Sequence, residues 1–311
     1  MSTRPHRLPL VPLGRAVLDR AAERRADLDD LGELLADPDT RVLEVVDSHC
    51  PVLDTQEGPR LQLRAGRPGD SARLPVFLGV DDERHAVVAL VGVMSEVVTP
   101  AVETPDAAPW RTLREVGQHL PDAEVALMTT ALALHHWHGT HGHCPRCGHP
   151  TVPARGGWVR RCERDGSEHH PRTDPAVIMA VVDDADRLLL ARNVGWPQGR
   201  FSVLAGFVEP GETLAQAVER EVLEEVGVRV TDVQHVGDQP WPFPNSLMFG
   251  HTARALGADL TLQEDEIAEA MWVARDDVPR LVEQGIWIPT RSRLSISTHL
   301  MEHWYGGPLL P

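Results

Sequence analysis

The chain has 311 residues, of which 42% are hydrophobic and 24% are charged, and its formal net charge is −16. That length suits two ordinary domains, and the composition is that of a globular protein. The acidic balance argues against a general nucleic-acid binder, because nonspecific binding to phosphates needs a basic surface, although a local site could still hold a capped RNA end. No apolar run approaches the ~18 residues of a membrane span, and the N-terminus lacks the apolar core of a secretory signal. We therefore expect a cytoplasmic protein without a membrane segment.

Residues 1–140 are expected to form an α+β domain. The apolar pattern predicts a helix over residues 15–36 and a second helix over residues 121–138. Between them, short β-like runs separated by turn residues predict strands over residues 41–46, 60–64, 75–80 and 86–91. No motif in this half points to chemistry, so we interpret it as a scaffold or dimerisation domain.

The four cysteines are distributed unevenly, because Cys144, Cys147 and Cys162 lie close together and Cys50 lies apart. Such clustering in a cytoplasmic chain indicates a metal site rather than disulfides, and Cys50 is expected to be a buried thiol. Cys144 and Cys147 have the spacing of a structural zinc knuckle. A full ribbon needs a second such pair further along the chain, and Asp165 stands where its last cysteine would be.

Residues 141–172 are therefore expected to form a zinc ribbon, and three possibilities remain for its fourth ligand. In the first, Asp165 completes a Cys3Asp site, since a carboxylate oxygen is an acceptable zinc ligand. In the second, a nearby histidine such as His169 or His170 completes the site. In the third, the metal is lost and packing alone keeps the ribbon. Ligand chemistry favours Asp165.

The third region runs from residue 173 to about 305 and begins with a hairpin of two apolar strands, at residues 176–182 and 188–192. A further strand is expected over residues 201–205. Thr213, with a glutamine three residues later, has the pattern of a capping box, so a helix is expected to begin there. Gly227 supplies the left-handed residue that ends this helix.

An acidic face is expected on that helix, because Glu221, Glu224 and Glu225 are spaced three and four residues apart. Glu212 lies just before the helix, and Arg220 can pair with an acidic neighbour and fix its orientation. The apolar stripe of the same helix borders this face, so the carboxylates lie beside the core. Carboxylates gathered in this way favour a hard divalent cation, whereas the alternative is a solvated acidic surface.

A proline-rich segment follows over residues 238–250, and it places Trp241 and Phe243 between three prolines. A stiff loop that presents flat side chains is suited to stacking on a nucleobase or a nicotinamide ring. The alternative is a loop that packs in the core, since buried aromatic residues mostly serve packing.

Residues 206–228 fill every specified position of the signature G-x5-E-x7-R-E-U-x-E-E-x-G-U, in which U is apolar, and the chain thereby resembles the Nudix hydrolases. The resemblance implies cleavage of a nucleoside diphosphate linked to another group. It also implies that Glu221, Glu224 and Glu225 bind Mg²⁺ or Mn²⁺, with the general base open between Glu224 and a later glutamate. The implied fold is α+β: a Nudix α/β/α sandwich with a mixed sheet over 173–305, preceded by the small zinc ribbon and a Nudix-like scaffold domain.

Within that superfamily, residues 239–246 resemble the Q-P-W-P-F-P-x-S segment of the NAD(H) diphosphatases, with Asp238 in place of a leading serine. Glu266 matches the metal-site glutamate that follows in these enzymes. The resemblance implies that Phe207 stacks on the nicotinamide ring and that the active form is a homodimer. The substrate contacts expected on this basis are Phe207, Gln239, Trp241, Phe243, Ser246 and Ser297.

The implied reaction converts NAD(H) and water into NMN(H) and AMP. Removal of an NAD cap from an RNA 5′ end is the same bond cleavage on a larger substrate, and the sequence does not choose between the two. One alternative is a Nudix hydrolase of ADP-ribose or another diphosphate, which the Trp241 segment disfavours. The other is a non-catalytic module that senses a dinucleotide, which the intact glutamates disfavour.

Overall fold

The computed structural model of the chain describes residues 7–9, 11–15, 19–67, 69–92, 108–288 and 292–309. The chain divides into two compact units. The C-terminal unit comprises residues 1–14, 174–240 and 246–311, and the N-terminal unit comprises residues 15–173 and 241–245. No helix in the described residues is both long and apolar enough to span a membrane.

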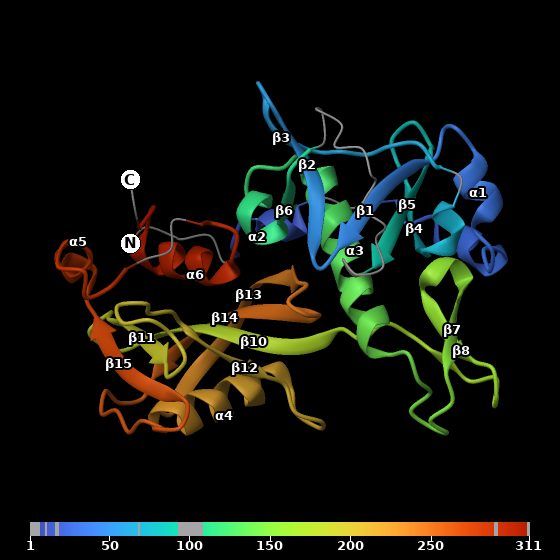
Figure 1. The fold of residues 1–311 in the computed structure, drawn as a ribbon. Helices are drawn as coiled ribbons and strands as arrows, with labels where there is room; N and C mark the ends of the chain where they lie inside the picture. Colours follow the sequence, from blue (N-terminus) through green and yellow to red (C-terminus); the bar gives the residue numbers. More distant parts are fainter. Residues whose placement is uncertain are drawn as a thin grey trace. The chain divides into compact units, whose positions relative to one another are not determined.

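The C-terminal unit is built on a mixed sheet with the strand order β13-β14-β10-β11-β15 (Figure 1). Its central strand β10 pairs parallel with β14 and antiparallel with β11, and β12 adds to β10. Strands β10 and β11, which come first along the chain in this sheet, form the hairpin that the sequence predicts. The strands are β10 (Asp174–Val182), β11 (Leu188–Asn193), β12 (Leu204–Phe207), β13 (Val230–Trp241), β14 (Ser246–Ala255) and β15 (Ile267–Val273).

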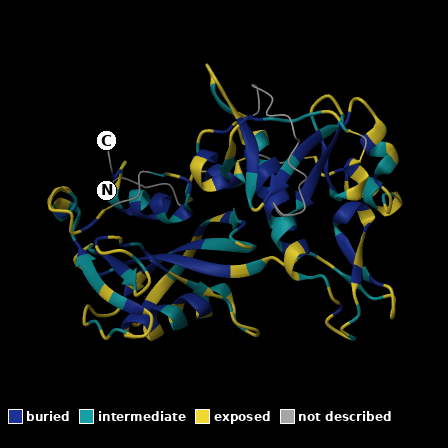
Figure 2. Ribbon diagram, in the orientation of Figure 1, coloured by how far each residue is buried: buried dark blue, intermediate teal, exposed yellow. Residues whose placement is uncertain are grey.

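Helices cover both faces of this sheet. Alternate residues of β10 point to opposite sides of the sheet, so the strand packs against helices on both sides. Val177 and Met179 pack against helix α4 (Leu214–Val226), whereas Ile178 and Ala180 pack in the cluster that contains helices α5 (Val278–Glu283) and α6 (Ile296–Tyr305). The strand is accordingly buried on both sides (Figure 2). The unit is therefore an α/β/α sandwich, as the sequence predicts.

Helix α4 has the boundaries that the sequence predicts. Thr213 caps its first turn: the Thr213 hydroxyl accepts from the backbone N–H of Gln216, and the Gln216 side chain accepts from the Thr213 N–H. Gly227 ends the helix with φ 74°, a conformation that glycine adopts without cost. These two ends fix which residues of the helix face the sheet.

The N-terminal unit holds a second mixed sheet, with the order β3-β2-β1-β5-β4 and with β6 paired to β2. Strands β1 and β5 are parallel, and the other pairings are antiparallel. Strand β2 was not predicted from the sequence, whereas β1 has the predicted bounds. The strands are β1 (Arg41–Val46), β2 (His49–Thr55), β3 (Gly58–Leu61), β4 (Leu74–Val80), β5 (Ala86–Gly92) and β6 (Trp110–Thr112).

The predicted long helix over residues 15–36 is wrong in the part that the structure describes; residues 16–18 lie outside it. A 3₁₀ segment (Ala22–Asp27) and the short helix α1 (Gly32–Ala36) occupy this stretch. Asp19 instead forms a β-bridge with Val80, and the Asp30 carboxylate accepts from the backbone N–H of Gly32, which breaks the helical path. The predicted second helix is confirmed as α3 (Asp122–Thr140), and the short α2 (Leu113–Val116) precedes it.

The ribbon is a small antiparallel sheet of β7 (Thr151–Ala154), β8 (Val159–Cys162) and β9 (Glu168–His169), and it belongs to the N-terminal unit. A buried arginine joins it to α3. Arg160 donates to the side chain and carbonyl of Thr151 and, at 3.0 Å, to Nδ1 of His138 on α3. His138 Nε2 in turn lies 2.8 Å from the carbonyl of Gly157. These bonds fix the ribbon against the long helix.

Candidate active site and metal centre

One arginine organises the acidic face of helix α4. The Arg220 guanidinium donates to Glu212 at 2.6 Å, to Glu221 at 2.9 Å and to Glu224 at 3.0 Å. It also donates to the backbone carbonyl of Phe207 on β12. The surrounding carboxylates raise the pKa of Arg220 further, so it is a permanent cation that holds three acidic side chains in place.

The glycine of the signature makes room for this cluster. A Cβ at Gly206 would lie 2.0 Å from the carboxyl carbon of Glu221, closer than any real contact. Gly206 sits on β12, which pairs with β10, so its backbone cannot retreat without breaking the sheet. Only glycine therefore lets Glu221 pack across the strand.

Glu225 differs from the other acidic residues because it is only 5% exposed. Burial raises its pKa to about 8, and the neighbouring carboxylates of Glu221, Glu266 and Glu224 act in the same direction. The pKa of Glu221 is also raised, chiefly by burial. A carboxylate that is buried among like charges is unfavourable alone and is stabilised by a cation.

Glu266 approaches the helix through backbone hydrogen bonds. The N–H of Gln263 donates to the carbonyl of Glu225 at 3.0 Å, and the N–H of Glu266 donates to Gln263. The carbonyl of Glu266 accepts from Val194, at the end of β11. These contacts bring Glu266 from beyond β14 to the C-terminal end of α4, where its charge acts on Glu221 and Glu225.

The oxygens of these glutamates are near neighbours but are not gathered to ligand spacing. In the described ranges, two groups of side chains bring three or more potential ligand atoms within 4.8 Å of one another. One is Cys144, Cys147, Cys162 and Asp165 in the ribbon, and the other is Asp81, Glu83 and His85. Arg220 draws Glu221 and Glu224 toward itself instead. The donor set, all carboxylate oxygen, is still the one that a hard divalent cation takes.

Two predicted substrate residues of the C-terminal unit are accessible. Phe207 ends β12 with 59% of its surface exposed, which is unusual for a phenyl ring and leaves it available for stacking. Ser297 lies in the first turn of α6, half-buried, and its hydroxyl is 2.7 Å from that of Ser202. Ser246 opens β14, opposite Asp174 of β10. Ser202 was not singled out from the sequence.

Gln239, one of the predicted substrate contacts, joins strand β13 to the start of helix α6. Its side chain has no exposed surface. The amide nitrogen donates to the carbonyl of Leu294, and the amide oxygen accepts from the N–H of Ile296, both at 2.7 Å. A side chain that is fully buried and bonded at both ends holds the start of α6, and the substrate contact of Gln239 stays a prediction.

The aromatic side chains of the proline-rich segment pack within the N-terminal unit. Residues 241–245 belong to that unit. The rings of Trp241 and Phe243 meet edge to face, with centroids 4.9 Å apart, and Arg114 lies over both. The sequence predicts the stiff loop but carries no signal for Arg114, which is about 130 positions away.

The ribbon contains two knuckles of the same construction. In the first, the N–H of Cys144 donates to His149 and the N–H of Gly148 donates to Cys144. In the second, Cys162 donates to Ser167 and accepts from Gly166 in the same pattern. Both glycines have φ 70°. By this equivalence Asp165 occupies the place in the second knuckle that Cys147 occupies in the first.

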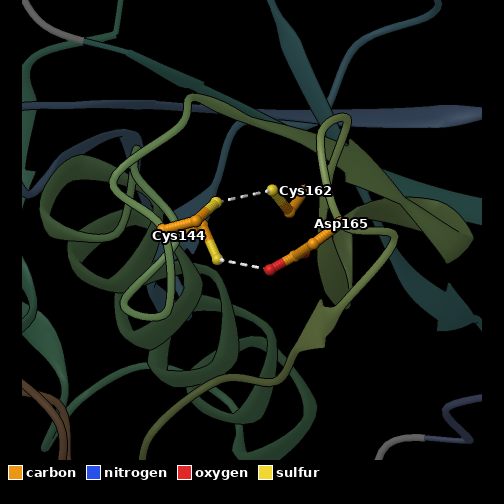
Figure 3. Close-up of side chains that lie close together, drawn as sticks. Cys144, Cys162 and Asp165 are labelled. Carbon is orange, nitrogen blue, oxygen red and sulfur yellow. Dashed lines mark hydrogen bonds between the residues drawn. The ribbon is translucent and has the colours of Figure 1, made fainter.

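Figure 3 shows the side chains of Cys144, Cys162 and Asp165 close together. With Cys147, they each offer a ligand atom within 4.8 Å of the others. The sulfurs of Cys147 and Cys162 are 3.5 Å apart, near the ~3.7 Å separation of two sulfurs on one tetrahedral zinc. Asp165 Oδ2 lies 3.7 Å from the sulfur of Cys144. The arrangement fits a zinc ion.

A neighbouring serine orients the Asp165 carboxylate. Ser167 donates both its hydroxyl and its backbone N–H to Oδ1 of Asp165, which leaves Oδ2 directed at the cysteines. These bonds hold the pKa of Asp165 well below its usual range, so it is ionised. His169 contacts the Ser167 hydroxyl, with its Nε2 at 3.1 Å. Cys50, by contrast, is fully buried in the sheet, as predicted, and burial raises its pKa to about 12.

Three family models match successive parts of the chain. Residues 40–137 match the NADH pyrophosphatase-like rudimentary NUDIX domain, residues 140–169 the NADH pyrophosphatase zinc ribbon domain, and residues 172–290 the NUDIX domain. The N-terminal half, for which the sequence alone offered no motif, is thus a degenerate relative of the catalytic fold.

Relatives of the chain align with it over all or part of its length. The NAD-capped RNA hydrolase NudC of Mycobacterium bovis is 37% identical over 306 residues, which cover 94% of each chain. An NAD-capped RNA hydrolase of Homo sapiens is 38% identical over 198 residues, covering 60% of this chain and 42% of that one. A NUDIX hydrolase of Nitrosomonas europaea superposes with a TM-score of 0.41 at 21% identity, over 53% of this chain and 94% of that chain. The chain belongs to the NADH pyrophosphatase family of Nudix hydrolases.

Proposed function

We propose that this protein hydrolyses the diphosphate of NAD(H) to NMN(H) and AMP, with Mg²⁺ or Mn²⁺ held by Glu221, Glu224, Glu225 and Glu266. The observation that carries the proposal is the burial of Glu225 among three other carboxylates, which raises its pKa to about 8. A protein does not stabilise itself with such a group, so it indicates a cation site.

The residues of the chain have separate tasks in this proposal. The bound cation would neutralise the diphosphate and lower the pKa of a water molecule. Arg220 keeps Glu212, Glu221 and Glu224 in fixed positions before the substrate arrives. The exposed ring of Phe207 is available to stack on the nicotinamide. Trp241 and Phe243 supply a second stacking surface, as the family resemblance implies.

We also propose that the protein removes an NAD cap from RNA, which is the same bond cleavage on a larger substrate. Relatives at 37% identity carry the name NAD-capped RNA hydrolase, which supports this extension. The net charge of −16 opposes extended contact with an RNA chain. We therefore expect recognition to be confined to the first nucleotides, and turnover of capped RNA to fall less steeply with salt than binding by a basic protein would.

A product assay with three substrates tests the function. NADH, ADP-ribose and an NAD-capped RNA are incubated with the protein and Mn²⁺, and the products are separated by chromatography. The proposal expects NMNH and AMP from NADH, a 5′-monophosphate RNA from the capped RNA, and slower cleavage of ADP-ribose. Preferred cleavage of ADP-ribose would support the alternative Nudix activity, and no cleavage of any of the three would support a sensing module.

The ribbon supports a second proposal, that Asp165 completes a Cys3Asp zinc site. Its support is the equivalence of the two knuckles and the orientation of the carboxylate by Ser167, since ligating carboxylates are themselves hydrogen-bonded. We expect about one zinc per chain on metal analysis. Asp165→Cys is expected to retain the zinc against a chelator for longer than the natural protein, and Asp165→Ala to lose it faster. Equal loss from all three would exclude Asp165 as a ligand.

We also propose that the protein acts in the cytoplasm as a homodimer. The four cysteines are free thiols, which is consistent with a reducing compartment. Light scattering at increasing protein concentration tests the oligomeric state, and a mass of one chain at every concentration would contradict the homodimer.

A further inference from the structure

The tip of the β13–β14 hairpin is anchored by residues that are far away in the sequence and have no assigned role. His136 of α3 lies with its Nδ1 3.1 Å from the carbonyl of Pro244, and its Nε2 is 2.7 Å from the Ser48 hydroxyl. Because a carbonyl only accepts, Nδ1 carries the proton toward Pro244. Asn245 donates to the carbonyl of Arg172, just before β10. The tip is therefore held at the carbonyl of Pro244 and at the side chain of the next residue, Asn245.

Arg114 holds the aromatic rings of the same tip. Its guanidinium carbon is 3.8 Å from the centroid of Phe243 and 5.0 Å from that of Trp241. The first distance is that of direct stacking, and both lie within the ~6 Å range of a cation–π contact. Both rings are half-buried. The guanidinium therefore restricts the angle at which the two rings stand to each other and to solvent.

The local structure around Arg114 keeps it rigid. Arg114 is the second residue of α2, whose start is fixed by a capping box: the Glu115 carboxylate accepts from the backbone N–H of Thr112 at 2.7 Å, and the Thr112 side chain caps Glu115 in return. The flanking residues Leu113 and Val116 are buried and attach the helix to the N-terminal unit. A rigid support of this kind suits a positioning role.

We propose that Arg114 is a positioning residue for substrate binding: it sets the orientation of Trp241 and Phe243, so that the N-terminal unit determines how well the dinucleotide ring is stacked. This inference rests on the proposed function, since it takes the substrate role of Trp241 from that function. It assigns a task to a residue of helix α2, for which the sequence offered no role. Arg114 acts through the rings and takes no part in diphosphate cleavage.

Two kinds of measurement test the proposal. The first is steady-state kinetics with NADH for Arg114→Ala, Arg114→Lys and the control Arg111→Ala, whose arginine pairs with Asp54 instead of the loop. The second is ¹⁹F NMR of protein labelled with 5-fluorotryptophan, in which the Trp241 resonance is assigned by Trp241→Phe. The melting temperature of each variant confirms that it is folded.

For Arg114→Ala we expect the Trp241 resonance to shift or broaden and the KM for NADH to rise about threefold to fivefold, with kcat within about twofold of the natural value; this matches the strength of a cation–π contact. Arg114→Lys keeps the charge but not the planar stacking, so its KM for NADH should lie between those of the natural protein and Arg114→Ala. Arg111→Ala should change neither readout.

An unchanged Trp241 resonance in folded Arg114→Ala would overturn the proposal, and so would a changed resonance with an unchanged KM. A fall in kcat without a change in KM would assign Arg114 to catalysis and contradict positioning. If the natural protein does not cleave NADH, the proposed function fails instead. The fluorine resonance then still shows whether Arg114 holds the ring.

Discussion

Gln239 accepts a 2.7 Å hydrogen bond from the backbone N–H of Ile296 and thereby ties strand β13 to the first residue of helix α6. The same amide donates to the carbonyl of Leu294. The residue comes from the segment that resembles a substrate-binding motif, yet its geometry is that of a fully buried clamp. Its effect on the reaction would pass through the position of Ser297, one residue into the helix.

Replacement of Gln239 by leucine should therefore lower stability. Two buried backbone groups lose their partners, which costs roughly 2–4 kcal/mol in unfolding free energy. Chemical denaturation measures this change. Gln234→Leu, at an exposed site on the same strand, should stay within about 0.5 kcal/mol of the natural protein. A loss of NADH binding without a loss of stability in Gln239→Leu would restore Gln239 as a substrate contact.

Phe207→Ala should separate substrate binding from folding. Because the ring is 59% exposed, its removal should leave the melting temperature nearly unchanged. The loss of a stacking contact should raise the KM for NADH about tenfold. Leu256→Ala removes another exposed apolar side chain of the same unit, 66% exposed, and should change neither quantity. If Phe207→Ala had the same KM for NADH as the natural protein, the ring would have no role in substrate recognition.

Trp241→Ala should likewise raise the KM for NADH far more than it lowers stability. Its ring is half-buried and contacts Phe243 and Arg114, so some stability is lost as well. The comparison of KM with melting temperature decides between binding and packing. A KM within error of the natural value, together with a large fall in melting temperature, would make Trp241 a packing residue only.

His138 should make the protein sensitive to acid. Burial lowers the pKa of His138 from its ordinary value of 6.5 to about 4, and the nearby Arg160 acts in the same direction. As the pH falls, His138 therefore takes up a proton in the unfolded chain before it does so in the folded protein. Its contribution to the free energy of unfolding is fully present above pH 6.5 and is lost between pH 6.5 and pH 4. The loss from this residue is about 3 kcal/mol.

Urea denaturation at several pH values checks this expectation. His138→Gln should flatten the fall in unfolding free energy between pH 6.5 and 4, whereas His119→Gln, at an exposed site, should not. Parallel curves for the natural protein and His138→Gln would show that His138 is not the group that titrates.

Helix α4 could be predicted closely because its signals are local. Thr213 and Gly227 define its ends, and the spacing of the glutamates defines its acidic face. The 15–36 helix failed because Asp19 pairs with Val80, a contact that no local pattern reveals. Strand β2 was missed since Pro51 interrupts its pattern, and only three of its seven residues are buried.

The ribbon contains a short repeat that is visible in the sequence. The residue after Cys147 and the residue after Asp165 are both glycine, and the two segments fold as the same knuckle. That repeat favours Asp165 over a histidine as the fourth ligand on sequence grounds alone. The anchoring of Trp241 by Arg114, in contrast, depends on tertiary contacts between distant segments and had no sequence signal.

Mn²⁺ binding followed by electron paramagnetic resonance tests whether the buried carboxylate of Glu225 holds a divalent cation. Because its pKa is raised to about 8, the cation must displace a proton below that pH. The Mn²⁺ affinity of the natural protein should rise between pH 6 and 8, by up to about tenfold per unit. Glu225→Gln should bind weakly at every pH, and Glu219→Gln, exposed on the same helix, should behave as the natural protein. Equal, pH-independent Mn²⁺ binding by the natural protein and Glu225→Gln would contradict the account.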